Sequence, residues 1–232
     1  MSYVLGIDTS STELGVGLAD NDRVIAGVSR YLRNSHAEHI SRMIDYLLSS
    51  CNVKPLEVDF AAIAVGPGSF TGLRIGISFL KGFCFGRSVG VLALSSLESM
   101  ATALCDFRRP IVAVFDGRNG QVFWARFVPM GNALVRASED ALGTFDDVEK
   151  TIDENDIVVA DTLGNAKSPL LDFADGNPNV FLVERRPVQR GLTCACIGMK
   201  AIKDTGRWTA CSEIAPRYLN VTSMERKLPC TP

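Results

Sequence analysis

Residues 59–76 read DFAAIAVGPGSFTGLRIG, so an apolar run leads through a glycine-rich turn into a segment of apolar and small residues. A short apolar run bounded by glycine and proline is typical of a buried strand, and the stretch predicts strand, loop and helix in succession. The turn lacks the lysine of the P-loop, and Thr71 stands where the dinucleotide fingerprint has its third glycine. The simplest role for these glycines is to let two backbones come close together.

The alternation of strands and helices extends over the first half of the chain. We predict strands at residues 3–7, 14–20, 23–32, 59–65 and 89–95. Helices are predicted at residues 37–50, 73–88 and 96–104. Ser35 is the expected N-cap of the first helix, and Ser95 or Ser96 that of the third. This order implies a mixed sheet with helices packed on its faces.

The second half repeats this order weakly, after a candidate boundary at residues 108–110. We predict strands at residues 111–116, 121–129, 133–138, 156–162 and 181–184. A weak helix is predicted at 144–152, and a longer one at 191–206 ends on Gly206. The repeated order of elements suggests two related lobes, the first at residues 1–107 joined by the helix at 191–205. The second lobe then covers residues 108–190, and residues 206–232 form a loop-like tail.

Composition describes an ordinary globular protein. The 232 residues are 47% hydrophobic and 22% charged, and the net charge of −2 gives no strong attraction to nucleic acid. The opening residues lack the features of a secretory signal, and no apolar run approaches the roughly twenty residues that cross a bilayer. Seven scattered cysteines are read as free thiols in a reducing compartment. The expectation is a cytoplasmic protein.

A hydroxyl-rich turn follows the first predicted strand, within IDTSSTELGVGL. Asp8, Thr9, Ser10 and Ser11 could accept a phosphate through backbone N–H groups and hydroxyls, with Asp8 orienting a hydrated Mg²⁺. The alternative is an ordinary turn, because turns favour these residue types. Sequence alone leaves both open.

Glycines recur on the helix that follows the glycine-rich turn. Gly72 and Gly76 are four residues apart, as are Gly82 and Gly86, and small residues at this spacing clear a groove for a second helix. Each glycine costs about 1 kcal/mol of helix stability relative to alanine, which suggests a compensating contact. We predict a subunit interface here; the alternative is tight packing on the chain's own sheet.

Patterns for catalysis are weak. His36 and His39 could share a helix face around Glu38, but the spacing is not that of a zinc motif, and no metal site is predicted. No catalytic triad is indicated by residue order. Asp116, Arg118 and Trp124 are interpreted as a turn and a partly buried aromatic.

Six segments occur in a characteristic order: IDTSSTELGVGL, HAEHISRMID, AVGPGSFTGLRIGISFLKG, VLALSSLESMA, DGRNGQVFWARF and APRYLN. Together they closely resemble the TsaB family, also called YeaZ, of bacterial proteins in tRNA threonylcarbamoyladenosine synthesis, over about residues 3–220. The resemblance implies an α/β, actin/hexokinase-like (ribonuclease H-like) fold with two lobes, the second reduced.

The resemblance also implies a role without independent activity. TsaB-like proteins pair with the catalytic subunit TsaD, are joined by the ATPase TsaE, and form homodimers through the same surface when alone. The complex transfers threonylcarbamoyl from its adenylate to N6 of adenosine 37 in ANN-decoding tRNA. This chain would contact the tRNA only through the complex, and no membrane is expected as a partner. No intrinsic cofactor is expected, and weak adenine nucleotide with Mg²⁺ would bind at or near the interface. The implied interface comprises Gly66, Pro67, Gly68, Ser69, Phe70, Thr71, Gly72, Arg74, Gly76, Phe79 and Phe83.

Some segments depart from the family pattern. Gln121 stands where an acidic residue is usual, and VVADTLGNA replaces a usual VGDG, which weakens the prediction of an adenosine pocket in the second lobe. The rival hypothesis is a small ATPase or sugar kinase of the same fold, favoured by the Asp8 turn. A metallopeptidase is disfavoured, because the two histidines lack a zinc spacing.

Overall fold

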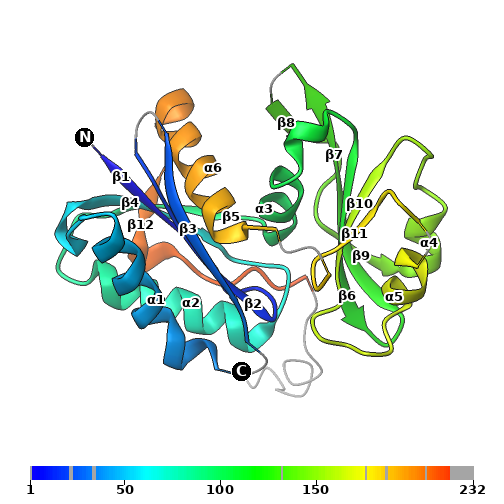
Figure 1. The fold of residues 1–232 in the computed structure, drawn as a ribbon, viewed down its shortest axis with the longest axis horizontal. Coiled ribbons are helices and arrows are strands. Elements are labelled where there is room, and N and C mark those ends of the chain that lie inside the picture. Colours follow the sequence, from blue (N-terminus) through cyan, green and yellow to red (C-terminus); the bar gives the residue numbers. More distant parts are fainter. Residues whose placement is uncertain are drawn as a thin grey trace, which may run out of the picture.

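The protein has two sheets that form two lobes side by side (Figure 1). The structure is a computed structural model, and it describes residues 2–20, 23–32, 35–131, 133–175, 177–185, 188–206 and 208–219. Within these residues no helix is both long and apolar enough to span a bilayer.

The first lobe is built on a six-stranded mixed sheet. Its strands are β1 (Tyr3–Asp8), β2 (Glu13–Ala19), β3 (Val24–Tyr31), β4 (Val58–Ala64), β5 (Gly90–Leu94) and β12 (Thr209–Ala210). Their order across the sheet is β12-β5-β4-β1-β2-β3. The first three strands pair antiparallel, whereas β1, β4 and β5 are parallel because helices connect them.

Helices cover both faces of this sheet. Helices α1 (His36–Ser50) and α2 (Phe70–Cys84) lie below it in Figure 1, and α6 (Arg190–Thr205) lies above. The apolar stripe of α1 predicted from its spacing is buried: Ile40, Met43, Ile44, Leu47 and Leu48. The helix begins directly after Ser35, as predicted, although the Ser35 side chain makes no capping hydrogen bond.

Helix α6 contacts the backbone of the first sheet at positions where both the helix and the sheet have glycine. A Cβ added to Gly191 would lie 2.2 Å from the carbonyl carbon of Gly15, and one added to Gly6 would lie 2.1 Å from the carbonyl oxygen of Gly191. No side chain fits into such contacts, so glycine is required on both elements. The contact sets the start of α6, and with it Arg190, against the turn between β1 and β2.

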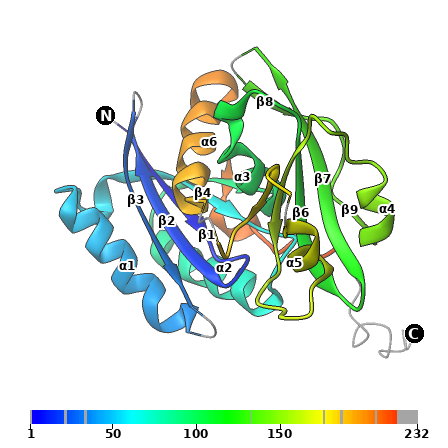
Figure 2. The same cartoon turned by 45° about the vertical axis from the view of Figure 1, so that its right-hand side comes forward.

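The second lobe has its own sheet, with strands β6 (Ile111–Arg118), β7 (Gln121–Met130), β8 (Ala133–Arg136), β9 (Ala141–Thr144), β10 (Ile157–Asp161) and β11 (Val180–Leu182). Helices α4 (Phe145–Glu149) and α5 (Pro169–Ala174) pack on its outer face. Helix α3 (Ser96–Thr102) packs on the inner face and also contacts α6, so these two helices lie between the sheets (Figure 2).

Most predicted elements are present, with some corrections. Ser95 caps α3, as predicted, by accepting hydrogen bonds from the N–H groups of Leu97 and Glu98. Gly206 ends α6 with φ of 60°, also as predicted. The prediction of loop throughout residues 206–232 is wrong at β12 and at a short 3-10 helix, Cys211–Glu213, and residues 220–232 lie outside the described residues. The lobe boundaries themselves stay a prediction.

Candidate functional site

The turn after β1 is closed by the chain's own atoms. Asp8 is fully buried; its Oδ1 accepts hydrogen bonds from the backbone N–H (2.8 Å) and hydroxyl (2.6 Å) of Ser10. Its Oδ2 accepts one from the Ser99 hydroxyl at 2.8 Å. Because both oxygens have partners and no surface is exposed, Asp8 does not fit a hydrated Mg²⁺. Thr9, Ser10 and Ser11 are buried with it, and nucleotide binding at these four residues stays a prediction.

A buried arginine lies between this turn and the second lobe. Arg190 is 1% exposed, its Nη1 lies 3.1 Å from Asp161 Oδ2 at the end of β10, and its Nη2 donates to the Ser11 hydroxyl. The guanidinium carbon also lies 5.7 Å from the centre of the Phe115 ring. One cation therefore donates a hydrogen bond to the hairpin of the first lobe and makes an ion pair and a ring contact with two strands of the second.

Burial and the nearby carboxylates act in opposite directions on the charge of Arg190. Burial opposes the charge of Arg190, but Asp8, Asp161 and Glu13 outweigh it and raise its pKa. Burial also raises the pKa of Asp161 to about 6, although Arg190 works in the opposite direction. The pKa of Glu13 is raised by burial as well. A cation that is surrounded by carboxylates and shielded from water is costly to remove.

The glycine-rich turn packs on the same hairpin. Gly66 and Gly68 have φ of 123° and 148°, and residues other than glycine rarely adopt such backbone angles. The Ser69 N–H donates a hydrogen bond to the Ser10 carbonyl at 2.6 Å. A Cβ on Gly72 would lie 2.1 Å from the Thr9 carbonyl oxygen, and one on Gly76 would lie 2.3 Å from the Thr9 hydroxyl oxygen. The close approach predicted from the glycines exists, but the approaching backbone is the chain's own.

The steric interpretation is therefore wrong for Gly72 and Gly76. Gly72 and Gly76 are sealed against Thr9 and cannot receive a helix of another protein. Gly82 is on α2 with nothing within 4 Å, whereas Gly86 lies beyond the end of α2 with φ of 71°, in a turn that the Arg87 N–H closes by donating to the Cys84 carbonyl. The four glycines are regularly spaced in the sequence, but they have three different environments in the structure.

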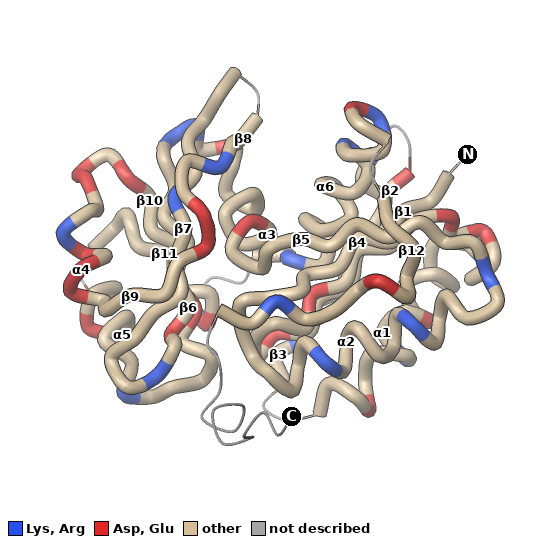
Figure 3. Tube along the Cα trace, turned by 180° about the vertical axis from the view of Figure 1, so that it is seen from behind, with Lys and Arg blue, Asp and Glu red and all other residues tan. Residues whose placement is uncertain are grey.

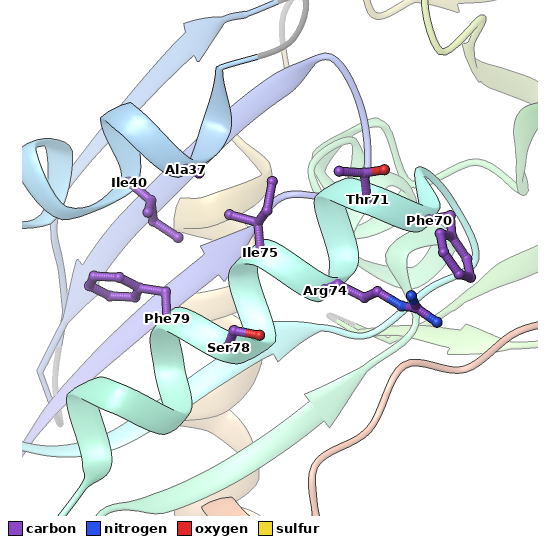
Figure 4. Close-up of a pocket in the computed structure, with 8 residues that line it drawn as sticks. All are labelled: Ala37, Ile40, Phe70, Thr71, Arg74, Ile75, Ser78 and Phe79. Atoms are coloured by element: carbon purple, nitrogen blue, oxygen red, sulfur yellow. The ribbon is translucent and has the colours of Figure 1, made fainter.

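A groove between α1 and α2 remains open on the outer surface (Figure 4). It has a volume of about 470 Å³ and a mostly apolar lining: Ala37, Ile40, Phe70, Thr71, Arg74, Ile75, Ser78 and Phe79. Four of these were predicted for the interface from the resemblance: Phe70, Thr71, Arg74 and Phe79. The other four follow the same helical spacing, which could have identified them.

The remaining predicted interface residues lie outside the groove lining. Gly66 and Pro67 are buried, Gly68 and Ser69 are half-buried, and the half-buried Phe83 stacks on Phe79 with ring centres 6.3 Å apart. Whether any of them touches a partner stays a prediction.

An aromatic cluster that the sequence did not indicate forms one end of the groove. Tyr218 stacks on Phe70 with ring centres 5.0 Å apart, and its hydroxyl accepts a hydrogen bond of 2.9 Å from Arg74 Nε. The Arg74 guanidinium carbon lies 3.8 Å from the centre of the Phe70 ring. The segment after β12 thus runs back along α2, which holds Phe70 and Arg74 in place.

The two histidines occupy different environments. His36 is buried against the carbonyl groups of Ser11 and Glu13, and burial lowers its pKa despite these contacts. His39 is more exposed, with its Nδ1 3.4 Å from Arg30. Among the described residues no group of three or more His, Cys, Asp or Glu side chains could hold a metal ion.

The second lobe has a turn that resembles the Asp8 turn. Asp116 is 2% exposed, and its carboxylate accepts hydrogen bonds from the Arg118 N–H (2.6 Å) and from Asn165 Nδ2 (3.1 Å). Trp124 is half-buried on β7. The predicted turn and partly buried aromatic are confirmed, and the Asp116 carboxylate, like that of Asp8, accepts hydrogen bonds from the chain's own groups.

Comparison with known proteins gives consistent results. A model of the TsaD family, described as tRNA N6-adenosine threonylcarbamoyltransferase, matches residues 29–172. A "tRNA threonylcarbamoyladenosine biosynthesis protein TsaB" of Bacillus subtilis (strain 168) is 37% identical over 120 residues, which cover 52% of each chain. A protein of the same name from Haemophilus influenzae is 31% identical over 127 residues, covering 54% of this chain and 53% of the relative. The match thus spans about half the length of these relatives.

A solved structure matches over nearly the whole chain. "YeaZ from Pseudomonas aeruginosa" has a TM-score of 0.74 at 23% identity, covering 94% of this chain and 100% of the other. The predicted two-lobed, actin-like α/β fold is confirmed by this likeness and by the two sheets.

Proposed function

The chain belongs to the TsaD family of tRNA N6-adenosine threonylcarbamoyltransferases and, within it, to the TsaB/YeaZ group, and from this we propose that it is a non-catalytic partner of a TsaD-like catalytic subunit. In this role it supports transfer of threonylcarbamoyl to N6 of adenosine 37 in ANN-decoding tRNA. A TsaE-like ATPase joins the pair in the cytoplasm, and two copies of the chain pair when no partner is present.

The groove between α1 and α2 is the observation that carries the proposal. Most helices of a globular protein pack their apolar residues inward, yet here Ile75 and Phe79 line a cavity that opens outward (Figure 4). A TsaD-like chain belongs to the same family and therefore presents a similar pair of helices. Two such pairs, packed face to face, would bury both apolar grooves, with Arg74 at the polar rim.

The hydrogen bonds of the buried Asp8 carboxylate support a non-catalytic role. Arg190 is buried between the lobes and is paired with Asp161, and a cavity of about 370 Å³ lies beside this pair, lined by residues of both lobes, among them Ser11 and Arg118. The Asp8 carboxylate has no free oxygen for a metal ion. This state of Asp8 favours a scaffold over the rival ATPase or sugar kinase.

The charge distribution supports contact with tRNA only through the complex. Basic and acidic positions are interspersed over both lobes in the view from behind (Figure 3), and the net charge is −2. Proteins that bind RNA by themselves need a basic surface, because phosphate contacts supply most of the affinity.

Reconstitution tests the proposed function. TsaD-like and TsaE-like subunits are incubated with an ANN-decoding tRNA, ATP and the threonylcarbamoyl precursors, with and without this chain, and the modified adenosine is measured by mass spectrometry. We expect modification to depend on the chain, and the chain alone to hydrolyse ATP negligibly. Equal modification without the chain would contradict the proposal. ATP turnover by the chain alone, abolished by Asp8→Asn, would instead support the kinase hypothesis.

A further inference from the structure

A second cavity opens where α2 ends against the segment after β12. Its volume is about 470 Å³, and it is lined by Lys81 and Cys84 of α2, by Phe85 and Arg87, and by residues 210–212. The proposed partner groove does not include it, and nothing in the proposed function requires it.

Two thiols meet in this cavity. Cys84 is 5% exposed and Cys211 is half-buried, both line the cavity, and Cys211 packs against the apolar cluster that contains Cys84. The two side chains therefore lie near each other although they are far apart in the sequence. Disulfide formation requires such proximity of the two sulfur atoms.

Secondary structure holds both cysteines in position. Cys84 is the last residue of α2, and Cys211 directly follows β12, in which Ala210 pairs with Gly90 of β5. Lys81 Nζ also donates to the Ser212 carbonyl at 3.3 Å, which links the two segments a second time. The thiols therefore stay together in the folded protein.

We propose that Cys84 and Cys211 form a redox-active dithiol, which a low-molecular-weight disulfide converts to an intramolecular disulfide. The Cys211 thiolate attacks one sulfur of the oxidant, whose S–S bond breaks and releases one thiol. The Cys84 sulfur loses its proton to water and attacks the Cys211 sulfur of the mixed disulfide, which releases a second thiol. Two protein thiols are oxidised to one disulfide, and the oxidant is reduced to two thiols.

The surroundings set the order of these steps. Burial, together with the neighbouring Cys211 thiol, raises the pKa of Cys84 to about 12, and the nearby Arg87 lowers it only partly. Cys84 is therefore protonated near neutral pH, and a protonated thiol is a poor nucleophile. Cys211 is the more exposed of the two, so it reacts first and Cys84 resolves the mixed disulfide.

The disulfide would fasten a segment that supports the partner groove. The chain continues from Cys211 to Tyr218, which stacks on Phe70 at the end of the groove. A covalent bond between α2 and this segment restricts its movement away from the helix. Transient disulfides of this kind are the usual type in reducing compartments.

The test uses the full chain and oxidised glutathione. After oxidation, free thiols are blocked with N-ethylmaleimide, and intact mass and peptide mapping identify the bonded residues. We expect the loss of two hydrogens, a single cross-linked peptide joining Cys84 to Cys211, a raised midpoint of thermal unfolding, and reversal by dithiothreitol. Cys51 serves as the internal control, and it stays free to react with the blocking agent.

Two variants test the order of reaction, with circular dichroism to verify that each is folded. Cys84→Ser should accumulate glutathione on Cys211, because the resolving thiol is missing. Cys211→Ser should leave Cys84 unmodified. A wild-type disulfide that joins another pair, such as Cys211 with Cys230, would overturn the proposal, as would equal alkylation of Cys84 and Cys211 before and after oxidation. The wild-type map alone decides this if a variant fails to fold.

Discussion

Replacing Gly72 by alanine tests whether the glycines of α2 serve the chain's own packing. The new methyl carbon would lie 2.1 Å from the Thr9 carbonyl oxygen, which is far inside van der Waals contact. That oxygen belongs to the backbone of a buried turn, so it cannot rotate away as the end of a side chain could. Gly82→Ala is the matched control, because nothing lies within 4 Å of a Cβ at that position of the same helix.

The two substitutions should change stability in opposite directions. Overpacking of a core typically costs about 1–3 kcal/mol, and a clash with fixed backbone belongs at the upper end. Alanine gains about 1 kcal/mol over glycine in a helix, which offsets part of this cost in Gly72→Ala and appears alone in Gly82→Ala. We expect a loss of about 2 kcal/mol for Gly72→Ala, a gain of up to about 1 kcal/mol for Gly82→Ala, and hence a difference of about 3 kcal/mol.

Urea unfolding followed by far-ultraviolet circular dichroism measures this difference directly. If Gly72→Ala unfolds at the same urea concentration as Gly82→Ala, the packing of α2 on Thr9 is refuted. Gly72 could then face a partner, as its spacing first suggested.

Three further changes test the buried network. Arg190→Met should cost about 3–5 kcal/mol of unfolding free energy, because Asp161 is left buried without its cation; a loss below about 1 kcal/mol would contradict this. Ser99→Ala should cost about 1–3 kcal/mol, since Asp8 loses a buried hydrogen bond, and an unchanged urea midpoint would refute that bond. The pKa of His36 lies below its ordinary value of 6.5, so the unfolded state binds the proton more readily and stability falls as pH drops through this range. Replacing His36 by glutamine should reduce this loss of stability at low pH, measured as the unfolding free energy at several pH values. A variant with the same pH profile as the unchanged protein would contradict the prediction.

The sequence predicted the larger elements because their apolar residues follow a clear period. It missed α5, whose six residues are too few for a helical pattern, although Ser168 as N-cap and Pro169 at the first position mark its start. It also missed β12, whose two residues are held by pairing with β5 and have no local pattern of their own.

The candidate site was harder to predict for a physical reason. Glycine spacing shows that something approaches the helix closely, but not which backbone approaches. Thr9 lies far from Gly72 in the sequence, so only the fold could show that the chain fills its own groove. The role of Arg190 was equally hidden, because its partners come from both lobes.

Binding of a TsaD-like subunit by charged variants tests the central claim most directly. Ser78 is exposed in the groove between α1 and α2, and Ser88 is exposed outside its lining, so Ser78→Arg and Ser88→Arg make the same change at two places. Isothermal titration calorimetry should show that Ser78→Arg weakens binding by about 100-fold, or about 2.7 kcal/mol, while Ser88→Arg leaves it unchanged. Undiminished binding by Ser78→Arg would contradict the assignment of the groove as the partner surface.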